Sequence, residues 1–431
     1  GNIDVNSSAV LDFSTTSAGG SPPPAGHINL KGDLTVVGSG LFQNSNTNTN
    51  GRLNFIGTGD GLTPATTQTI DIASTSANEN RYISFDVQNG AYVQLINRDL
   101  ELGQRDTFKV STGGVFDFNF NGTTPLLVKT SGSQSAMVFQ SKQASTLKIT
   151  SPDGLYGNYI TSVFPSVTAT TGNLQIAKSN REINNEATFW YIGKVNQQTG
   201  DAPNASSTGS GSYSTSANGK VVICDLTTNN LTLTPSLSFG VTNNTPVSAT
   251  GGKLDIRKGQ FTETTAAYID GSTGTLYMEP GTRYYIPKGS ADTAAAKGDL
   301  IPRMTGSTYA YVLNGDTIEL TGTGFGVNAS QVLRKDNSNY DYHNITFSGA
   351  NTLGSDYKSI SDETTITDSL YITGTAIVDC RNNAAQARSF VGYGGLIMDG
   401  GSRIRIKKMN TPNPELEGVN EPYTLSSGTV E

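Results

Sequence analysis

Hydrophobic and polar residues alternate along short stretches of this chain, a pattern typical of half-buried β-strands. The runs are short and end in Gly, Asn, Asp or Pro. No stretch places apolar residues at helical spacing between helix caps, so the sequence predicts an all-β protein. The clearest runs have apolar residues at alternate positions: Ile83, Phe85, Val87; Phe116, Phe118, Phe120; Leu276, Met278; Tyr284, Ile286; Ile345, Phe347; and Leu370, Ile372.

Short phrases of the sequence also return at long range. Gly57-Thr58-Gly59 recurs as Gly322-Thr323-Gly324, an offset of 322 − 57 = 265 residues, and the glycines before Asp117 have counterparts before Asp379. Recurrence of short strand-forming segments favours a solenoid, in which each coil stacks on its neighbours. We therefore predict a right-handed parallel β-helix with irregular loops protruding from its coils. The hand follows from the general preference for right-handed crossovers.

The recurring phrases extend over the whole chain of 431 residues. We expect residues 1–431 to form one continuous β-helix segment of a longer chain. The approximate internal repeats are 14–118, 119–256 and 257–380, followed by a partial repeat at 381–431.

Composition and charge exclude several classes of partner and of structure. The net charge is −7 and no basic run exceeds Lys407-Lys408, so nucleic acid is not an expected partner. No apolar stretch approaches the about 18 residues of a transmembrane helix. Only Cys224 and Cys380 are present, which is too few for a disulfide framework. We expect both cysteines to be buried and unpaired.

Two longer phrases carry a resemblance to a known class of protein. Residues 146–154 (TLKITSPDG) with 172–175, and residues 187–193 (ATFWYIG) with 198–201, resemble very large surface proteins of Bacteroidota. The resemblance implies secretion through the type IX system and display on the cell surface. It also implies a role as an adhesin in attachment or gliding motility.

We expect a structural or adhesive scaffold, an elongated stalk of a secreted adhesin, without enzymatic activity. The alternative is a polysaccharide-binding or polysaccharide-degrading parallel β-helix protein. Such an enzyme needs acidic and basic residues clustered on one sheet. The recurring Asp12, Asp117, Asp255 and Asp379 are instead expected about five coils apart, as solvated positions or turn anchors. No Gly-x-Ser-x-Gly or His-Glu-x-x-His motif is present.

Phe189-Trp190-Tyr191 is the candidate contact site, because it holds the only tryptophan of the chain. Strand alternation buries one or two of these rings and leaves at least one exposed, where it suits the face of a sugar. The alternative is packing beneath residues 201–219. The expected partners are surface polysaccharide or other components of the cell surface and the secretion machinery.

Three residues are candidates for modification. Thr293, Thr317 and Ser369 each follow Asp and precede an aliphatic residue, and so resemble the O-glycosylation sites of Bacteroidota. We expect no cofactor. A structural calcium ion is the alternative, although the dense Gly/Asp nonapeptides of calcium-binding β-rolls are absent from the sequence.

Overall fold

A computed structural model describes most of the chain and contains strands but no α-helix among the residues described. The chain divides into two compact units, Gly1–Ile223 (unit 1) and Cys224–Glu431 (unit 2). Strand β22 (Val221–Thr232) contains the division. The described residues are 1–6, 9–14, 26–45, 50–57, 67–73, 82–103, 105–130, 137–156, 172–176, 180–184, 186–199, 221–232, 237–238, 252–263, 269–270, 274–287, 310–322, 329–333, 342–351, 356–360, 364–380, 390–391, 395–406, 416–417 and 424–431.

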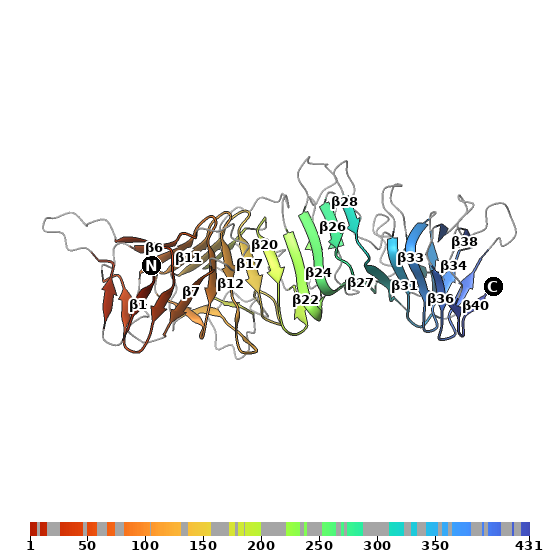
Figure 1. Ribbon diagram of the computed structural model, residues 1–431, viewed down its shortest axis with the longest axis horizontal. Helices are drawn as coiled ribbons and strands as arrows, with labels where there is room; N and C mark the ends of the chain where they lie inside the picture. Colours follow the sequence, from red (N-terminus) through yellow and green to blue (C-terminus); the bar gives the residue numbers. More distant parts are fainter. Residues whose placement is uncertain are drawn as a thin grey trace. The chain divides into compact units, whose positions relative to one another are not determined.

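Unit 1 is a stack of coils whose short strands form two long parallel sheets, faces 1 and 2, and two smaller parallel sheets, here grouped as face 3 (Figure 1). Face 1 consists of β3 (His27–Leu30), β6 (Gly51–Phe55), β8 (Ile83–Val87), β11 (Thr107–Val110), β16 (Val138–Ser141) and β19 (Arg181–Ile183). Face 2 consists of β1 (Ile3–Val5), β4 (Leu34–Val36), β7 (Thr67–Ile72), β9 (Tyr92–Leu95), β12 (Val115–Asp117), β17 (Thr146–Ile149) and β20 (Thr188–Tyr191). Face 3 consists of β2 (Val10–Asp12) with β5 (Leu41–Gln43), and β10 (Leu100–Leu102) with β15 (Val128–Thr130) and β18 (Leu174–Gln175).

The two remaining pieces of unit 1 are an antiparallel hairpin, β13 (Phe120–Asn121) with β14 (Thr124–Pro125), and the short β21 (Gln197–Gln198). The interior of the unit is a column of phenylalanines from successive coils. Phe85, Phe108 and Phe139 are in register on face 1, and the rings of Phe108 and Phe139 stack at 5.4 Å between their centres. Identical residues in register bury the same kind of surface in three consecutive coils, which stabilises the stack.

Four described corners between faces 1 and 2 are β-turns that end in a small buried residue, here called the corner residue. The corner residues Ala91, Gly114, Ser145 and Ala187 each donate their N–H to the carbonyl three residues earlier, at 2.9 to 3.1 Å. A side chain added at Gly114 would approach the carbonyl oxygen of Val87 to 2.5 Å. The inside of a corner therefore accepts only small residues, because it packs against the coil before it.

Unit 2 also consists of parallel strands (Figure 1). Its long sheet is β27 (Arg283–Ile286), β29 (Thr317–Leu320), β31 (Tyr342–Phe347), β33 (Thr364–Ile372), β36 (Gly395–Met398) and β39 (Thr424–Leu425). Its second sheet is β30 (Ala329–Leu333), β32 (Asp356–Ile360), β34 (Ile377–Asp379), β37 (Arg403–Arg405) and β40 (Thr429–Val430). The other strands are β24 (Gly252–Thr262), β26 (Gly274–Met278), β28 (Ala310–Leu313), β23 (Leu237–Ser238), β25 (Ile269–Asp270), β35 (Phe390–Val391) and β38 (Leu416–Glu417).

The all-β, parallel β-helix architecture predicted from the alternation is confirmed. The inward positions of the clearest runs, such as Phe85, Met278 and Phe347, are fully buried. Cys224 and Cys380 are buried and free, as expected. The right-handed crossover, the single continuous segment over 1–431 and the repeats at 14–118, 119–256, 257–380 and 381–431 stay predictions.

Candidate functional site

Four outward-facing side chains form a row across face 2 of unit 1: Gln94 on β9, Asp117 on β12, Lys148 on β17 and Trp190 on β20. The strand register pairs Asp117 with Gln94 and with Lys148, and Lys148 with Trp190. Tyr92 lies two residues before Gln94 on the same side of the sheet. We call these five residues the outer ladder, and hydrogen bonds, an ion pair and cation–π contacts join them to one another.

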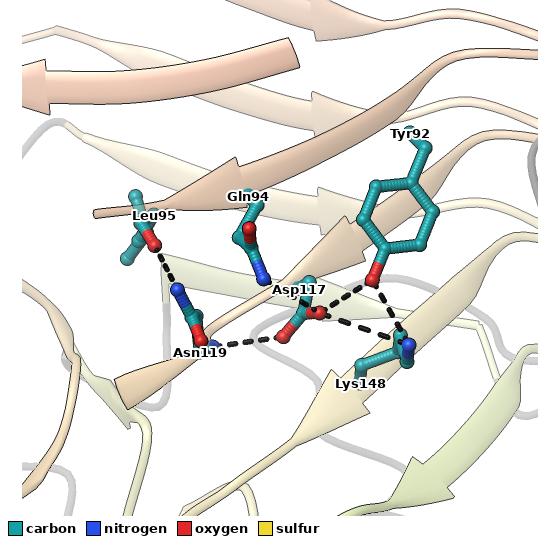
Figure 2. A network of polar contacts seen from close by, with 6 residues as sticks. All are labelled: Tyr92, Gln94, Leu95, Asp117, Asn119 and Lys148. Atoms are coloured by element: carbon teal, nitrogen blue, oxygen red, sulfur yellow. Dashed lines mark hydrogen bonds and ion pairs between the residues drawn. The ribbon is translucent and has the colours of Figure 1, made fainter. Parts of the chain in front are cut away.

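Asp117 is the centre of the outer ladder (Figure 2). Its carboxylate accepts hydrogen bonds from the Tyr92 hydroxyl at 2.6 Å, from Gln94 Nε2 at 3.3 Å and from the Asn119 main-chain N–H at 2.8 Å. Lys148 Nζ lies 3.7 Å from the same carboxylate. Asp117 is buried, and a buried carboxylate is stable only when donors and an opposite charge surround it.

Lys148 connects the carboxylate to the aromatic rings. Its amine donates to the Tyr92 hydroxyl at 2.9 Å, and it lies 5.1 Å from the centre of the Tyr92 ring and 4.6 Å from that of Trp190. Burial raises the pKa of Tyr92 far above its ordinary value, and the neighbouring charge of Asp117 raises it further. Tyr92 therefore stays a neutral hydroxyl that donates to Asp117.

The three predicted aromatic contact residues divide as strand alternation requires. Phe189 and Tyr191 are fully buried, and the Tyr191 hydroxyl donates to the Thr199 carbonyl at 2.7 Å. Trp190 faces outward and is half-buried beside Lys148. Only Trp190 of the three thus presents part of its ring, and whether it contacts a ligand stays a prediction. Residues 201–219, the alternative packing partner, lie outside the described residues.

The outer ladder has a defined chemical capacity. A half-buried indole with an ammonium group over its ring combines an apolar surface with a positive charge, which suits a sugar ring carrying acidic or hydroxyl groups. Asp117 is less suited to acid–base catalysis, since its oxygens already accept from three donors and pair with Lys148. A substrate proton would have to compete with those donors.

The other recurring aspartates are more buried than a solvated position would be. Asp255 and Asp379 are 1% and 3% exposed, and each pairs with basic side chains: Asp255 with Arg257 at 3.0 Å, and Asp379 with Arg405 at 3.4 Å. The expectation of solvated positions is therefore wrong for these residues, because cations in the same or the next strand neutralise them. The turn-anchor role is confirmed for Asp12, whose Oδ1 accepts the Ser14 N–H at 2.7 Å. Asp117 anchors Asn119 in the same way.

The candidate modification residues lie in different surroundings. Thr293 is outside the described residues. Thr317 is half-buried at the start of β29, directly after the buried Asp316. Ser369 is half-buried in β33, and its hydroxyl donates to the exposed Asp368 at 3.5 Å. Of the two described sites, only the one at Ser369 offers its preceding Asp to an enzyme.

No group of three or more His, Cys, Asp or Glu side chains is placed to hold a metal ion within the described ranges. The structural calcium ion stays a hypothesis. In the same part of the chain, no helix is long and apolar enough to cross a membrane.

Sequence reasoning found Trp190 and Asp117 but missed Tyr92, Gln94 and Lys148. The sequence does contain a pattern that could have revealed the four residues of the row, namely their spacing from the corner residues. Gln94, Asp117, Lys148 and Trp190 each stand three residues after a small corner residue. Alignment of the corners would have placed these four residues on one row.

In comparisons with known proteins, no protein-family model, no curated protein and no solved structure matches the chain.

Proposed function

We propose that this chain is a structural and adhesive scaffold that is secreted and displayed on a bacterial cell surface. The observation that carries the proposal is the stacking of coils around an apolar core. Phenylalanines of consecutive coils stack in register in unit 1, while outward charges such as Asp117 and Lys148 are neutralised by neighbouring strands. Such a stack offers a long, self-supporting surface and leaves its neutralised charges little free to do chemistry.

The resemblance to the surface proteins of Bacteroidota supplies the setting of the proposal: export by type IX secretion, and a role in attachment or gliding. The partners are surface polysaccharide or other components of the cell surface and the secretion machinery. In this role the outer ladder is the contact region, with Trp190 as its platform.

A polysaccharide-binding module is the second candidate, and the Lys148–Trp190 pair favours it. A polysaccharide-degrading enzyme has less support, because Asp117, the one carboxylate of the outer ladder, already accepts three hydrogen bonds and pairs with Lys148. The two candidates share the surface but differ in whether new sugar chain ends form.

The proposal is tested on the cells that make the protein. An antibody raised against residues 1–431 should label intact, unpermeabilised cells and reduce their attachment to a surface. Labelling that needs permeabilised cells would contradict the surface location. Surface labelling with unchanged attachment would contradict the adhesive role.

A further inference from the structure

The corner residues of unit 2 follow the same rule as those of unit 1, with one exception. Thr282, Ala376 and Ser402 are buried and each donates its N–H to the carbonyl three residues earlier. Asp316 occupies the equivalent place between β28 and β29, after Gly315, whose φ of +72° matches the +77° of Gly281 before Thr282. An acidic residue thus stands where Thr282, Ala376 and Ser402 stand in their corners. Asp106 of unit 1 is also buried directly before a strand, but its carboxylate accepts the main-chain N–H groups of Ile83 and Gly103 at 2.9 and 2.8 Å.

Asp316 is 1% exposed, and neither oxygen of its carboxylate accepts a hydrogen bond from another described residue. Only its own main-chain N–H acts on the carboxylate, as a small effect that lowers the pKa against the larger effect of burial. The nearest donors serve its main chain instead. The main-chain N–H of Asn344 and its side-chain Nδ2 both donate to the Asp316 carbonyl oxygen at 3.1 Å. A buried carboxylate without donors is costly when charged and far less costly when protonated.

The described charged side chains around this corner form no ion pair with Asp316, and two of them, Arg283 and Lys358, bond to other residues. On the preceding coil Thr282 is uncharged, and the adjoining Arg283 pairs with Glu319 at 3.2 Å. On the following coil the strand register pairs Thr317 with Asn344, which follows His343, and no ion pair between His343 and Asp316 is present among the described residues. In the second sheet, the buried Lys358 donates to the Gly322 carbonyl at 2.8 Å.

The remaining carboxylates near the corner have partners of their own. Glu319, further along β29, also accepts the Ser348 hydroxyl at 2.6 Å. Glu279, in the preceding turn, accepts the Tyr277 hydroxyl at 2.8 Å. Among the described residues, no ion pair joins Asp316 to Arg283, His343 or Lys358.

We propose that Asp316 is a proton-dependent latch of unit 2: it is protonated while the corner between β28 and β29 is closed, and its ionisation opens that corner. Burial raises the pKa of Asp316 from its ordinary 3.8 to about 7, which agrees with this placement. In an opened corner water solvates the carboxylate and returns the pKa toward 3.8. The closed state therefore holds the extra proton, and the stability of the corner falls as the pH rises from about 4 to about 7.

The test is hydrogen exchange of residues 313–320 in the full chain between pH 5 and pH 8, corrected for intrinsic exchange rates. The linkage relation predicts about a hundredfold more opening at pH 8 than at pH 5 in the native protein. Asp316→Asn, which keeps the shape but carries no charge, should abolish that pH dependence. Asp368→Asn, at an exposed carboxylate of the same unit, should leave it intact. Equal pH dependence in native and Asp316→Asn protein would overturn the proposal.

If Asp316→Asn folds poorly, a second variant, Asp316→Ala, tests the same proposal. Asp316→Ala restores the small corner residue and should make the corner insensitive to pH. In infrared difference spectra at pH 6, the native protein should show a protonated carboxyl band that Asp316→Ala lacks. Identical spectra would overturn the proposal in the same way, and neither outcome depends on whether the protein is an adhesin.

Discussion

Lys148 Nζ lies 4.6 Å from the centre of the Trp190 ring, on the neighbouring strand and in register with it. The two residues are 42 positions apart along the chain, so their contact depends on correct stacking of the two coils. Trp190 is the only tryptophan in the protein. Its fluorescence is therefore a specific reporter of the outer ladder.

Replacement of Lys148 by Met should change the emission of Trp190 and destabilise unit 1. The variant removes the ammonium from the indole and leaves the buried Asp117 without its cation, which should cost about 1–3 kcal/mol. Fluorescence-monitored urea unfolding measures both effects. Lys142→Met is the matched control, because Lys142 is exposed in the turn before β17. Equal spectra and midpoints in both variants would contradict the ladder geometry.

The stacked phenylalanines should dominate the stability of unit 1. Phe108 packs against Phe85 at 5.8 Å, Phe139 at 5.4 Å and Phe116 at 4.6 Å between ring centres. Phe108→Ala should cost about 3–5 kcal/mol, as expected for a cavity in a fully buried site. The neighbouring Lys109 faces outward and pairs with Asp86 at 2.6 Å, so Lys109→Ala should cost at most about 1 kcal/mol. Denaturant unfolding that ranks the two variants in the reverse order would refute the assigned core.

Gly57, the first residue of the phrase that recurs at Gly322, is required for close stacking. A Cβ at Gly57 would lie 2.4 Å from the Gly90 carbonyl oxygen and 2.6 Å from the Ala91 Cα. These are backbone atoms of the next coil, so Gly57→Ala should cost about 3 kcal/mol, the upper end for overpacked sites. Gly122→Ala has open space and meets only the strain of its positive φ of 62°, which costs about 1 kcal/mol. Thermal unfolding of the two variants compares these costs directly.

The three candidate glycosylation sites should be modified unequally if the enzyme acts on folded protein. Ser369 follows an exposed Asp368, whereas Thr317 follows an Asp316 that is 1% exposed. Peptide mapping of protein from its native host should find a glycan on Ser369 and none on Thr317. A glycan on Thr317 would mean that modification precedes folding. An unmodified chain at Thr293, Thr317 and Ser369 would end the glycosylation hypothesis.

The strand content of this protein could be predicted from its sequence because alternation records burial directly. Phe85 and Phe347, for example, alternate with polar residues along their strands, and both are fully buried. The burial of Cys224 and Cys380 could likewise be predicted, because both stand at apolar positions of the pattern. The recurring phrases also had a physical basis, since Gly113 and Gly374 both have positive φ in corners that precede a strand ending in a buried aspartate.

The candidate site was harder to predict, because its members meet only through strand register. Coil length varies: face 2 pairs Tyr92 with Val115, but Thr146 with Thr188. No fixed period in the sequence therefore aligns Lys148 with Trp190. The burial of Asp379 could not be foreseen for the same reason, since its partner Arg405 lies on the next strand. Asp255 differs, because Arg257 stands two residues away on the same strand and alternation places both on one side of the sheet.

The most direct test of the account is incubation of the purified chain with a panel of polysaccharides, with bound ligand and released sugar ends followed in the same samples. The account predicts retention of at least one polysaccharide without new chain ends, and loss of that retention in Trp190→Ala. Release of new chain ends would contradict the scaffold and support the degrading enzyme. Failure to retain any polysaccharide would contradict the outer ladder as a sugar contact.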